Sequence, residues 1–270
     1  LSFETPYNNL LLYHGLGTGK TCSAIGVCEE MRDYLKQVGI NKRIIIIASP
    51  NVQDNFKLQL FDERKLIKKN GMWSMNACVG NKFLKEINTD IPKKRIVKQI
   101  KRIIDKSYLF LGYEQFSNYI SRKIKDKDRK RGIRKIKREF SNRLIVIDEV
   151  HNIRSTEDSP HKQVATNLLN LVTHTDNLKL LLLSATPMYN SYKEIIWLLN
   201  LMNLNDNRSP IRHLDIFDKE GHFKIDEKGH EVGRDLLIQK SSGYVSYIRG
   251  ENPYSFPFKI WPTKFSKKNS

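Results

Sequence analysis

The chain has 270 residues, of which 39% are hydrophobic, so it can bury one large core or two modest ones. No apolar run approaches the roughly 18 residues of a membrane span, and the N-terminus lacks the charged start and apolar middle of a signal peptide. We therefore expect an intracellular soluble protein with no membrane partner. The 47 Lys and Arg against 29 Asp and Glu give a formal charge of +18, which indicates attraction to a polyanion.

Apolar runs and helix-period segments alternate along the chain. The run at 10–13 precedes a predicted helix over 21–38, and the β-branched run at 43–48 precedes a helix that starts at Asn51. Continuous apolar runs are typical of parallel strands that are buried on both faces. Three more such runs, each followed by a helix-like stretch, occur at 108–111, 143–147 and 178–183. The pattern predicts an α/β fold with a doubly wound, mostly parallel sheet, whose ligand lies outside the carboxyl ends of the strands.

The three cysteines, Cys22, Cys28 and Cys78, form no CxxC pair. Two of them fall at helical spacing among apolar residues. An odd number of cysteines without metal-type spacing indicates reduced packing residues, so we expect all three to be reduced, in a compartment of the cytosolic type.

A glycine-rich loop joins the first predicted strand to the first predicted helix. Its glycines let the backbone N–H groups and the helix N-terminus face phosphates. Lys20 would reach the β and γ phosphates, and the Thr21 hydroxyl would bind Mg²⁺. His14 stands where the pattern G-x-x-x-x-G-K-[ST] has its first glycine, and a glycine turn with an incidental lysine is the alternative. The predicted nucleotide-binding residues are His14, Gly15, Leu16, Gly17, Thr18, Gly19, Lys20 and Thr21.

The positive charge is concentrated in residues 93–138, which contain eighteen basic and four acidic residues. Such a segment indicates a nucleic-acid partner. For the run 122–131 the alternative is a solvated helix face or a disordered loop. The salt dependence of binding distinguishes the two, because each phosphate contact adds roughly 0.9 to the log–log slope on duplex DNA.

Two acids, Asp148 and Glu149, follow the fourth predicted strand. Asp148 can hold Mg²⁺ through its water shell, and Glu149 can orient or deprotonate an attacking water. The alternative is structural: the acids would cap a helix or pair with Arg143 or Arg154.

The fifth predicted strand ends in Ser184-Ala185-Thr186-Pro187. The hydroxyls of Ser184 and Thr186 could hydrogen-bond the acidic pair or a water linked to the γ-phosphate. An ordinary turn that caps the next helix is the alternative.

These segments resemble the motifs of superfamily 2 helicases. Residues 14–21 resemble Walker A, Asp148-Glu149-Val150-His151 the DEVH form of Walker B, and Ser184-Ala185-Thr186 the third motif. Ala48-Ser49-Pro50-Asn51 resembles motif Ia, and Gly112-Tyr113-Glu114 the motif Ib region. Longer phrases are similar to viral helicases of the nucleocytoplasmic large DNA viruses, which include the poxvirus early-transcription-factor and transcript-release ATPases; they lie at 11–15, 148–154, 184–197 and 243–253.

The resemblance implies a RecA-like P-loop NTPase fold that uses ATP and Mg²⁺ and acts on DNA or RNA. It assigns catalysis to Lys20, Asp148 and Glu149, and metal binding to Thr21 and Asp148. In such proteins, residues at the positions of His151, Ser184 and Thr186 couple the ATP site to the nucleic acid. Contacts to the nucleic-acid backbone would come from Ser49, Pro50, Asn51, Gly112 and Tyr113. A viral member would work in the host cytoplasm or the virion, with RNA polymerase as a further partner.

The same resemblance suggests how the chain divides. We expect residues 1–204 to form the ATP-binding RecA-like domain, and 205–270 a polar extension and an aromatic, proline-rich linker toward a second RecA-like domain outside this chain. The arginine-finger segment of the family does not occur in the sequence. Because such a finger contributes about 10³ to 10⁵ in rate, we expect the chain alone to bind ATP and to hydrolyse it slowly.

Two further expectations concern the extension and the function. Residues 214–217 and 222–225 read as the arms of a small hairpin. The functional alternative to a motor is a transcription-factor subunit whose nucleotide only switches its affinity for nucleic acid or polymerase.

Overall fold

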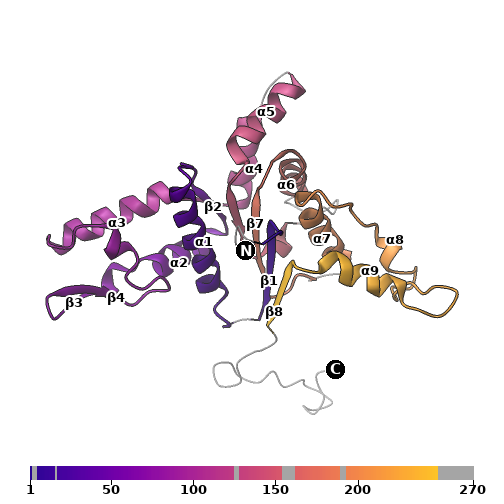
Figure 1. The fold of residues 1–270 in the computed structure, drawn as a ribbon, viewed down its shortest axis with the longest axis horizontal. Helices are drawn as coiled ribbons and strands as arrows, with labels where there is room; N and C mark the ends of the chain where they lie inside the picture. The colour runs from indigo at the N-terminus through magenta and orange to yellow at the C-terminus, as the bar shows by residue number, and fades with distance from the viewer. Residues whose placement is uncertain (2–4, 16, 125–127, 154–161, 189–192, 249–270) are drawn as a thin grey trace, which may run out of the picture.

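A six-stranded parallel sheet organises the molecule (Figure 1). The computed structural model describes residues 1, 5–15, 17–124, 128–153, 162–188 and 193–248. The strand order is β5-β2-β6-β7-β1-β8, and every neighbouring pair is parallel. The strands are β1 Asn9–His14, β2 Ile44–Ile47, β5 Tyr108–Leu111, β6 Leu144–Ile147, β7 Lys179–Ser184 and β8 Val245–Ile248. The prediction of a mostly parallel α/β sheet is confirmed, and its five strands are all present.

Helices cover both faces of the sheet because successive strand residues point to opposite sides. Ile44, Ile46 and Val146 pack on one side with α1 Lys20–Gln37, α2 Pro50–Leu60 and α3 Lys93–Ser107. The alternate residues of the same strands pack on the other side with α4 Tyr113–Ile124, α5 Arg129–Phe140, α6 Lys162–His174 and α7 Lys193–Asn205. In the described part of the chain, no helix has the length and apolar character that a membrane span requires.

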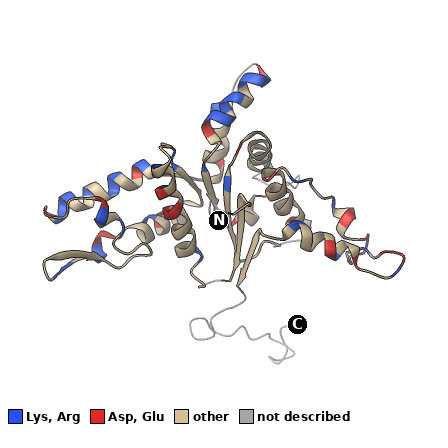
Figure 2. Ribbon diagram, in the orientation of Figure 1, with Lys and Arg blue, Asp and Glu red and all other residues tan. Residues whose placement is uncertain are grey.

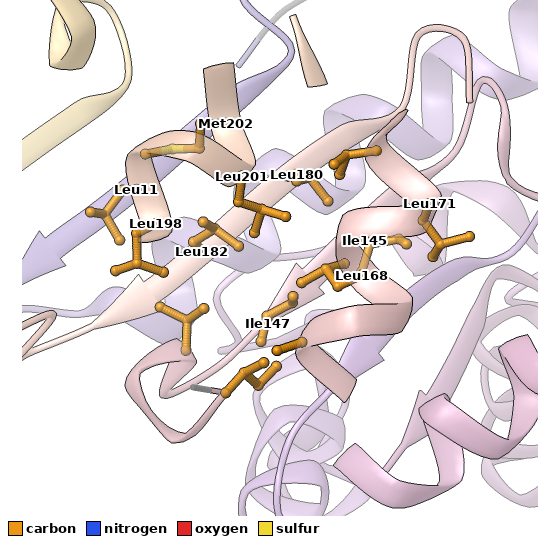
Figure 3. Close-up of a cluster of buried hydrophobic side chains, with 14 of the residues drawn as sticks. Leu11, Ile145, Ile147, Leu168, Leu171, Leu180, Leu182, Leu198, Leu201 and Met202 are labelled. Atoms are coloured by element: carbon orange, nitrogen blue, oxygen red, sulfur yellow. The ribbon is translucent and has the colours of Figure 1, made fainter. Parts of the chain in front are cut away.

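Figure 3 shows the second of these cores. Leu180 and Leu182 of β7 and Ile145 and Ile147 of β6 meet side chains of α6 and α7, and all four strand residues are fully buried. Truncating one such leucine to alanine typically costs about 2–5 kcal/mol. The central strands therefore form a rigid platform for the residues that follow them.

A hairpin that the sequence analysis did not predict follows α2. A short helical turn, η1 Glu63–Lys65, leads into β3 Leu66–Lys69 and β4 Met72–Met75, which pair antiparallel. The turn is Asn70-Gly71, with φ of 49° and 82°, as a two-residue hairpin turn requires. Only Leu66 and Met75 of the hairpin strands are buried, so the alternation typical of a strand is weak. After it, η2 Phe83–Glu86 returns the chain toward α3.

The predicted extension beyond residue 204 joins the same sheet. Tyr244 is fully buried in the core, and β8 pairs with β1. The expected first hairpin arm is wrong: its residues form the helical turn α8 His213–Ile216, although Phe217 bridges Phe223 antiparallel. The helix α9 Val232–Ser241 packs closely on α8, because a Cβ on Gly233 would lie 2.0 Å from the Ile216 carbonyl oxygen. Tyr254, Phe256, Phe258 and Trp261 of the predicted linker lie outside the described residues.

The expectation of three reduced cysteines is wrong for two of them. Cys22 and Cys78 form a disulfide, with their Cα atoms 5.3 Å apart. The sequence could not show this because the hairpin brings the segment after β4 onto the first turn of α1. Cys28 is free and fully buried, and burial raises the pKa of its thiol well above the ordinary value. It is the packing residue that was expected.

Candidate nucleotide site

The predicted site residues come together at one edge of the sheet. Because all strands are parallel, the residues after β1, β2, β5, β6 and β7 meet at their carboxyl ends. The register brings them level, since Tyr13 pairs with Ser184 and Ile47 pairs with both Leu111 and Ile147. We call this the carboxyl edge; it lies at the bottom of Figure 1, where β1 passes to α1.

The glycine-rich loop bends as its sequence predicts. Gly17 and Gly19 have φ of 74° and 82°, a left-handed conformation that side chains with a Cβ rarely adopt. The Thr18 hydroxyl closes the turn by donating to the Gly15 carbonyl oxygen at 2.7 Å. Gly19 precedes the first residue of the 18-residue helix α1, so the free N–H groups of that helix face the loop. Leu16 lies outside the described residues.

Lys20 folds over the loop. Its ammonium group donates to the carbonyl oxygens of His14 at 2.9 Å and Gly15 at 3.1 Å. Both acceptors are neutral, and phosphate oxygens would accept charge-assisted bonds that are roughly twice as strong. A Cβ built on Gly19 would meet nothing within 4 Å, so the space beside the loop is open. The donor set and this space fit a nucleotide phosphate.

His14 is held by a residue that the motifs did not include. Its Nε2 lies 2.9 Å from the Ser246 Oγ on β8, and the residue is 4% exposed. Burial, and then the charge of Lys20, lower the pKa of His14. Ser246 lies within residues 243–253, a segment that is similar to the viral helicases. No pattern in that segment predicted a strand that pairs with β1.

Asp148 and Glu149 emerge from β6 into a half-buried position. Burial, and then the neighbouring Glu149 charge, raise the pKa of Asp148 to about 6, although Lys20 acts in the opposite direction. Burial also raises the pKa of Glu149, again against the charge of Lys20. Glu149 has a φ of 44°, which is uncommon for a residue with a side chain. Two desolvated carboxyls beside one ammonium form a set that a divalent cation would satisfy.

The backbone of Asp148 is fixed by the first residue of α4 and by the neighbouring strand β2. The Tyr113 hydroxyl donates to the Asp148 carbonyl oxygen at 2.8 Å, and burial raises the pKa of that phenol to about 12. The backbone N–H of Asp148 donates to the Ile47 carbonyl oxygen at 2.9 Å. Tyr113, expected from the motif Ib resemblance to contact nucleic acid, thus also anchors the acidic pair.

A polar chain connects β6 to β7. The Nδ1 of His151 lies 3.2 Å from the Glu149 carboxylate and 3.0 Å from the Ser184 hydroxyl. Ser184 is fully buried, and its Oγ accepts from the backbone N–H of Thr186 at 3.0 Å. The three residues predicted to couple the site are therefore linked to one another and to Glu149. Thr186, at the end of this chain of contacts, is exposed.

The other residues with predicted nucleic-acid contacts lie on the same edge. Ser49 precedes α2, with Pro50 in its first turn, and Ser49 makes no side-chain cap. Pro50 and Asn51 are exposed. Gly112 follows β5 and donates its N–H to the Gln115 side chain at 2.9 Å. Ser49 is partly buried, so Pro50 and Asn51 form the exposed surface at the start of α2.

The chain matches a known family over most of its length. The sequence profile of the SNF2-related domain matches residues 2–241. The glycine-rich loop, the acidic pair and the segment 184–186 all lie within the matched region.

Viral proteins are among the similar sequences. A predicted ATP-dependent RNA helicase of Acanthamoeba polyphaga mimivirus is 28% identical over 94% of this chain and 40% of its own length. A predicted helicase of Invertebrate iridescent virus 3 is 26% identical over 91% of this chain and 21% of its own. An early transcription factor large subunit homologue of African swine fever virus is 22% identical over 97% of this chain and 27% of its own. The chain thus spans less than half the length of these relatives.

Proposed function

Because the chain belongs to the SNF2-related domain family, we propose that it is the ATP-binding half of a viral, ATP-dependent nucleic-acid motor, a helicase or translocase. One observation carries the proposal: Lys20 and the two acids after β6 meet at the carboxyl edge, close enough for the Lys20 charge to act on the pKa of both carboxyls. Phosphoryl transfer needs a cation on the phosphates and a water-positioning acid on adjoining strands.

Each side chain has a proposed role. The glycine-rich loop and Lys20 hold the phosphates of ATP, while Thr21 and Asp148 hold Mg²⁺. The metal, when bound, neutralises charge on the phosphates. Glu149 orients the attacking water and accepts its proton, for which a raised pKa is well suited. His151, Ser184 and Thr186 carry the state of that acid to the nucleic-acid face.

The remainder of the motor belongs to other chain segments. We propose that a second RecA-like domain outside this chain supplies the arginine fingers, which the length of the viral relatives supports. The 270 residues alone would bind ATP and hydrolyse it slowly. Because the African swine fever virus relative is named as a transcription factor subunit, we propose RNA polymerase as a further partner of the full-length protein. The proposed location is the host cytoplasm or the virion.

Turnover tests the proposal. Phosphate release by the full-length protein is measured with and without DNA or RNA, beside the variant Glu149→Gln. We expect nucleic acid to stimulate release, and the variant to lose at least about 100-fold in rate while still binding ATP. No release under any condition, with nucleic-acid affinity that still depends on ATP, would replace the motor by the nucleotide-switched transcription factor.

A further inference from the structure

The most basic helix lies at the opposite edge of the sheet from the predicted ATP site. The end of α5 contacts residues that come just before strands: Lys42 Nζ donates to the carbonyl oxygens of Arg138 and Ser141, both at 2.7 Å. Arg143 Nε donates to the Arg43 carbonyl oxygen, also at 2.7 Å. We call this side the amino edge. In Figure 1, α5 projects beyond the sheet at the top, whereas the carboxyl edge lies at the bottom.

The outward face of α5 carries cations without acidic partners. In Figure 2, Lys and Arg colour much of α5, between segments of other residues. Arg131 lies 3.7 Å from Asp128, and Lys137 lies 3.2 Å from Asp176. Among the residues that the structure describes, no carboxylate pairs with the four remaining exposed cations. We define these four as the α5 stripe: Arg129, Lys130, Arg134 and Arg138.

This arrangement of charge works against the helix that bears it. The first turn holds three cations, where the helix dipole favours negative charge, and a single acid, the N-cap Asp128, stands against them. Lys130, Arg134 and Arg138 stand at i, i+4 spacing, where like charges repel. The helix is held by the buried face that contains Ile136 and Phe140. A polyanion along the outward face would remove the repulsion.

The stripe has the chemistry of a phosphate-backbone contact rather than of a protein interface. From Lys130 to Arg138 it extends over about 12 Å of helix, comparable with three or four phosphates of one strand at about 3.4 Å each. The exposed residues of α5 are all basic within the described part of the chain. A protein interface of ordinary type would place apolar or aromatic anchors at its centre.

The basic surface continues from the base of α5 across the amino edge. A hollow of about 320 Å³ lies between the ends of α1 and α3, and Lys36, Lys42 and Lys106 line it. The Glu86 carboxylate in the same hollow is already bound by Arg32 and Lys36. Lys106 is exposed, and burial, followed by the Arg143 charge, lowers the pKa of Lys42. The amino edge therefore has an excess of positive charge next to the helix.

We propose that the α5 stripe is a second nucleic-acid surface, which binds the phosphate backbone without sequence preference at the amino edge, away from ATP and from residues 49–51 and 112–113. The inference rests on the proposed function for the class of ligand. A motor with this surface holds nucleic acid at both edges of its sheet and stays attached when the nucleotide-gated edge releases its strand.

The test is the salt dependence of duplex binding by the full-length protein without nucleotide. A fluorescent 30-base-pair DNA is titrated by anisotropy at several salt concentrations between about 50 and 200 mM. The variant Arg129→Gln/Lys130→Gln/Arg134→Gln/Arg138→Gln should lower the log–log slope by about 3 and the affinity at 100 mM salt by on the order of 100-fold. The smaller variant Arg134→Gln/Arg138→Gln should lower the slope by about 2.

A matched control removes the same charge from the far side of the molecule. Lys219, Lys224, Lys228 and Arg234 are exposed around α8 and α9, and their replacement by glutamine should leave the slope within about 1 of the parent. Equal loss in both variants would overturn the proposal, because the effect would then come from net charge. Full DNA affinity in the α5 variants would also overturn the proposal. If these variants bound DNA normally but no longer bound poly-glutamate, the ligand of the α5 stripe would be an acidic protein instead. ATP-dependent turnover that persists in those cases would leave the proposed function standing.

Discussion

The two edges of the sheet are built on opposite principles. At the carboxyl edge Glu149 has a left-handed backbone, Asp148 is desolvated beside a second acid, and Lys20 donates to two neutral carbonyls. At the amino edge Arg32 contacts both Glu29 and Glu86, and Lys36 also reaches Glu86. Local conflict of this kind is concentrated at functional sites, because a ligand resolves it. Unpaired charge therefore marks the predicted nucleotide site at the carboxyl edge, whereas Arg32, Lys36 and Glu86 at the amino edge pair with one another.

The largest expected effect is a loss of ATP affinity at the carboxyl edge that is accompanied by little loss of stability. Lys20→Ala removes the charge proposed to hold two phosphates, so we expect ATP affinity to fall about 1000-fold or more. The free energy of unfolding should fall by only about 1–3 kcal/mol, since the bonds to two backbone carbonyls and the attraction to the two acids are lost. Titration with a fluorescent ATP analogue and urea unfolding measure the two quantities.

Lys36→Ala is the matched control for that substitution. It changes the same residue type on the same helix at the other edge, where Lys36 pairs with Glu86. ATP affinity should be unchanged. If instead Lys20→Ala kept its affinity, the glycine-rich loop would be an ordinary turn.

A smaller effect is expected for the free energy of unfolding of Asp148→Asn. This substitution should stabilise the fold, whereas most substitutions of buried residues destabilise it. The pKa of Asp148 in the folded chain is about 6, above its value in the unfolded chain, so the charged carboxylate destabilises the fold at higher pH. Without Mg²⁺, Asp148→Asn should therefore raise the free energy of unfolding by about 2–3 kcal/mol at pH 8. The gain should shrink as the pH falls through 6 toward 4. Denaturant midpoints at both pH values measure it, and a loss of stability at pH 8 would contradict it.

The smallest expected effect lies at the amino edge and has the reverse pH dependence. Burial alone would raise the pKa of Glu86, but the hydrogen bonds from Arg32 and Lys36 outweigh it and lower the pKa to about 2. The stability from this carboxylate is present above its unfolded pKa near 4.5 and is lost as the pH falls through 2.

Glu86→Gln should therefore cost about 1–2 kcal/mol at pH 7, a range that allows for solvent screening of the partly exposed group. The difference from the parent should vanish at the acid end of a pH series of unfolding curves. ATP affinity should not change. A cost that stayed constant down to pH 2 would show that packing, not charge, accounts for it.

The sheet could be predicted from the sequence because its strands are continuous apolar runs. Ile44–Ile47 and Leu144–Ile147 are fully buried, and such runs are seldom found elsewhere in a soluble fold. The hairpin β3–β4 could not be predicted from the sequence, because only one residue in each of its strands is buried. The strand β8 was missed for a related reason: Val245 and Tyr247 are exposed at the sheet margin, where the pattern is weak.

The residues of the candidate site could be predicted from the sequence, but the residues that they contact could not. A strand, a glycine-rich turn and a helix in succession predict where Lys20 lies, since the chain order alone decides it. The contacts of Tyr113 with Asp148 and of His14 with Ser246 join residues 35 and 232 positions apart. Such contacts depend on strand order, which local periodicity does not contain.

The disulfide makes part of this molecule a covalent ring. Residues 22 to 78 form a closed loop that includes strand β2 and the exposed hairpin tip at Asn70-Gly71. A protease that nicks the tip would leave two fragments that still migrate as one species until they are reduced. The hairpin could thus be cut while the first turn of α1 stayed tethered to the segment that follows β4.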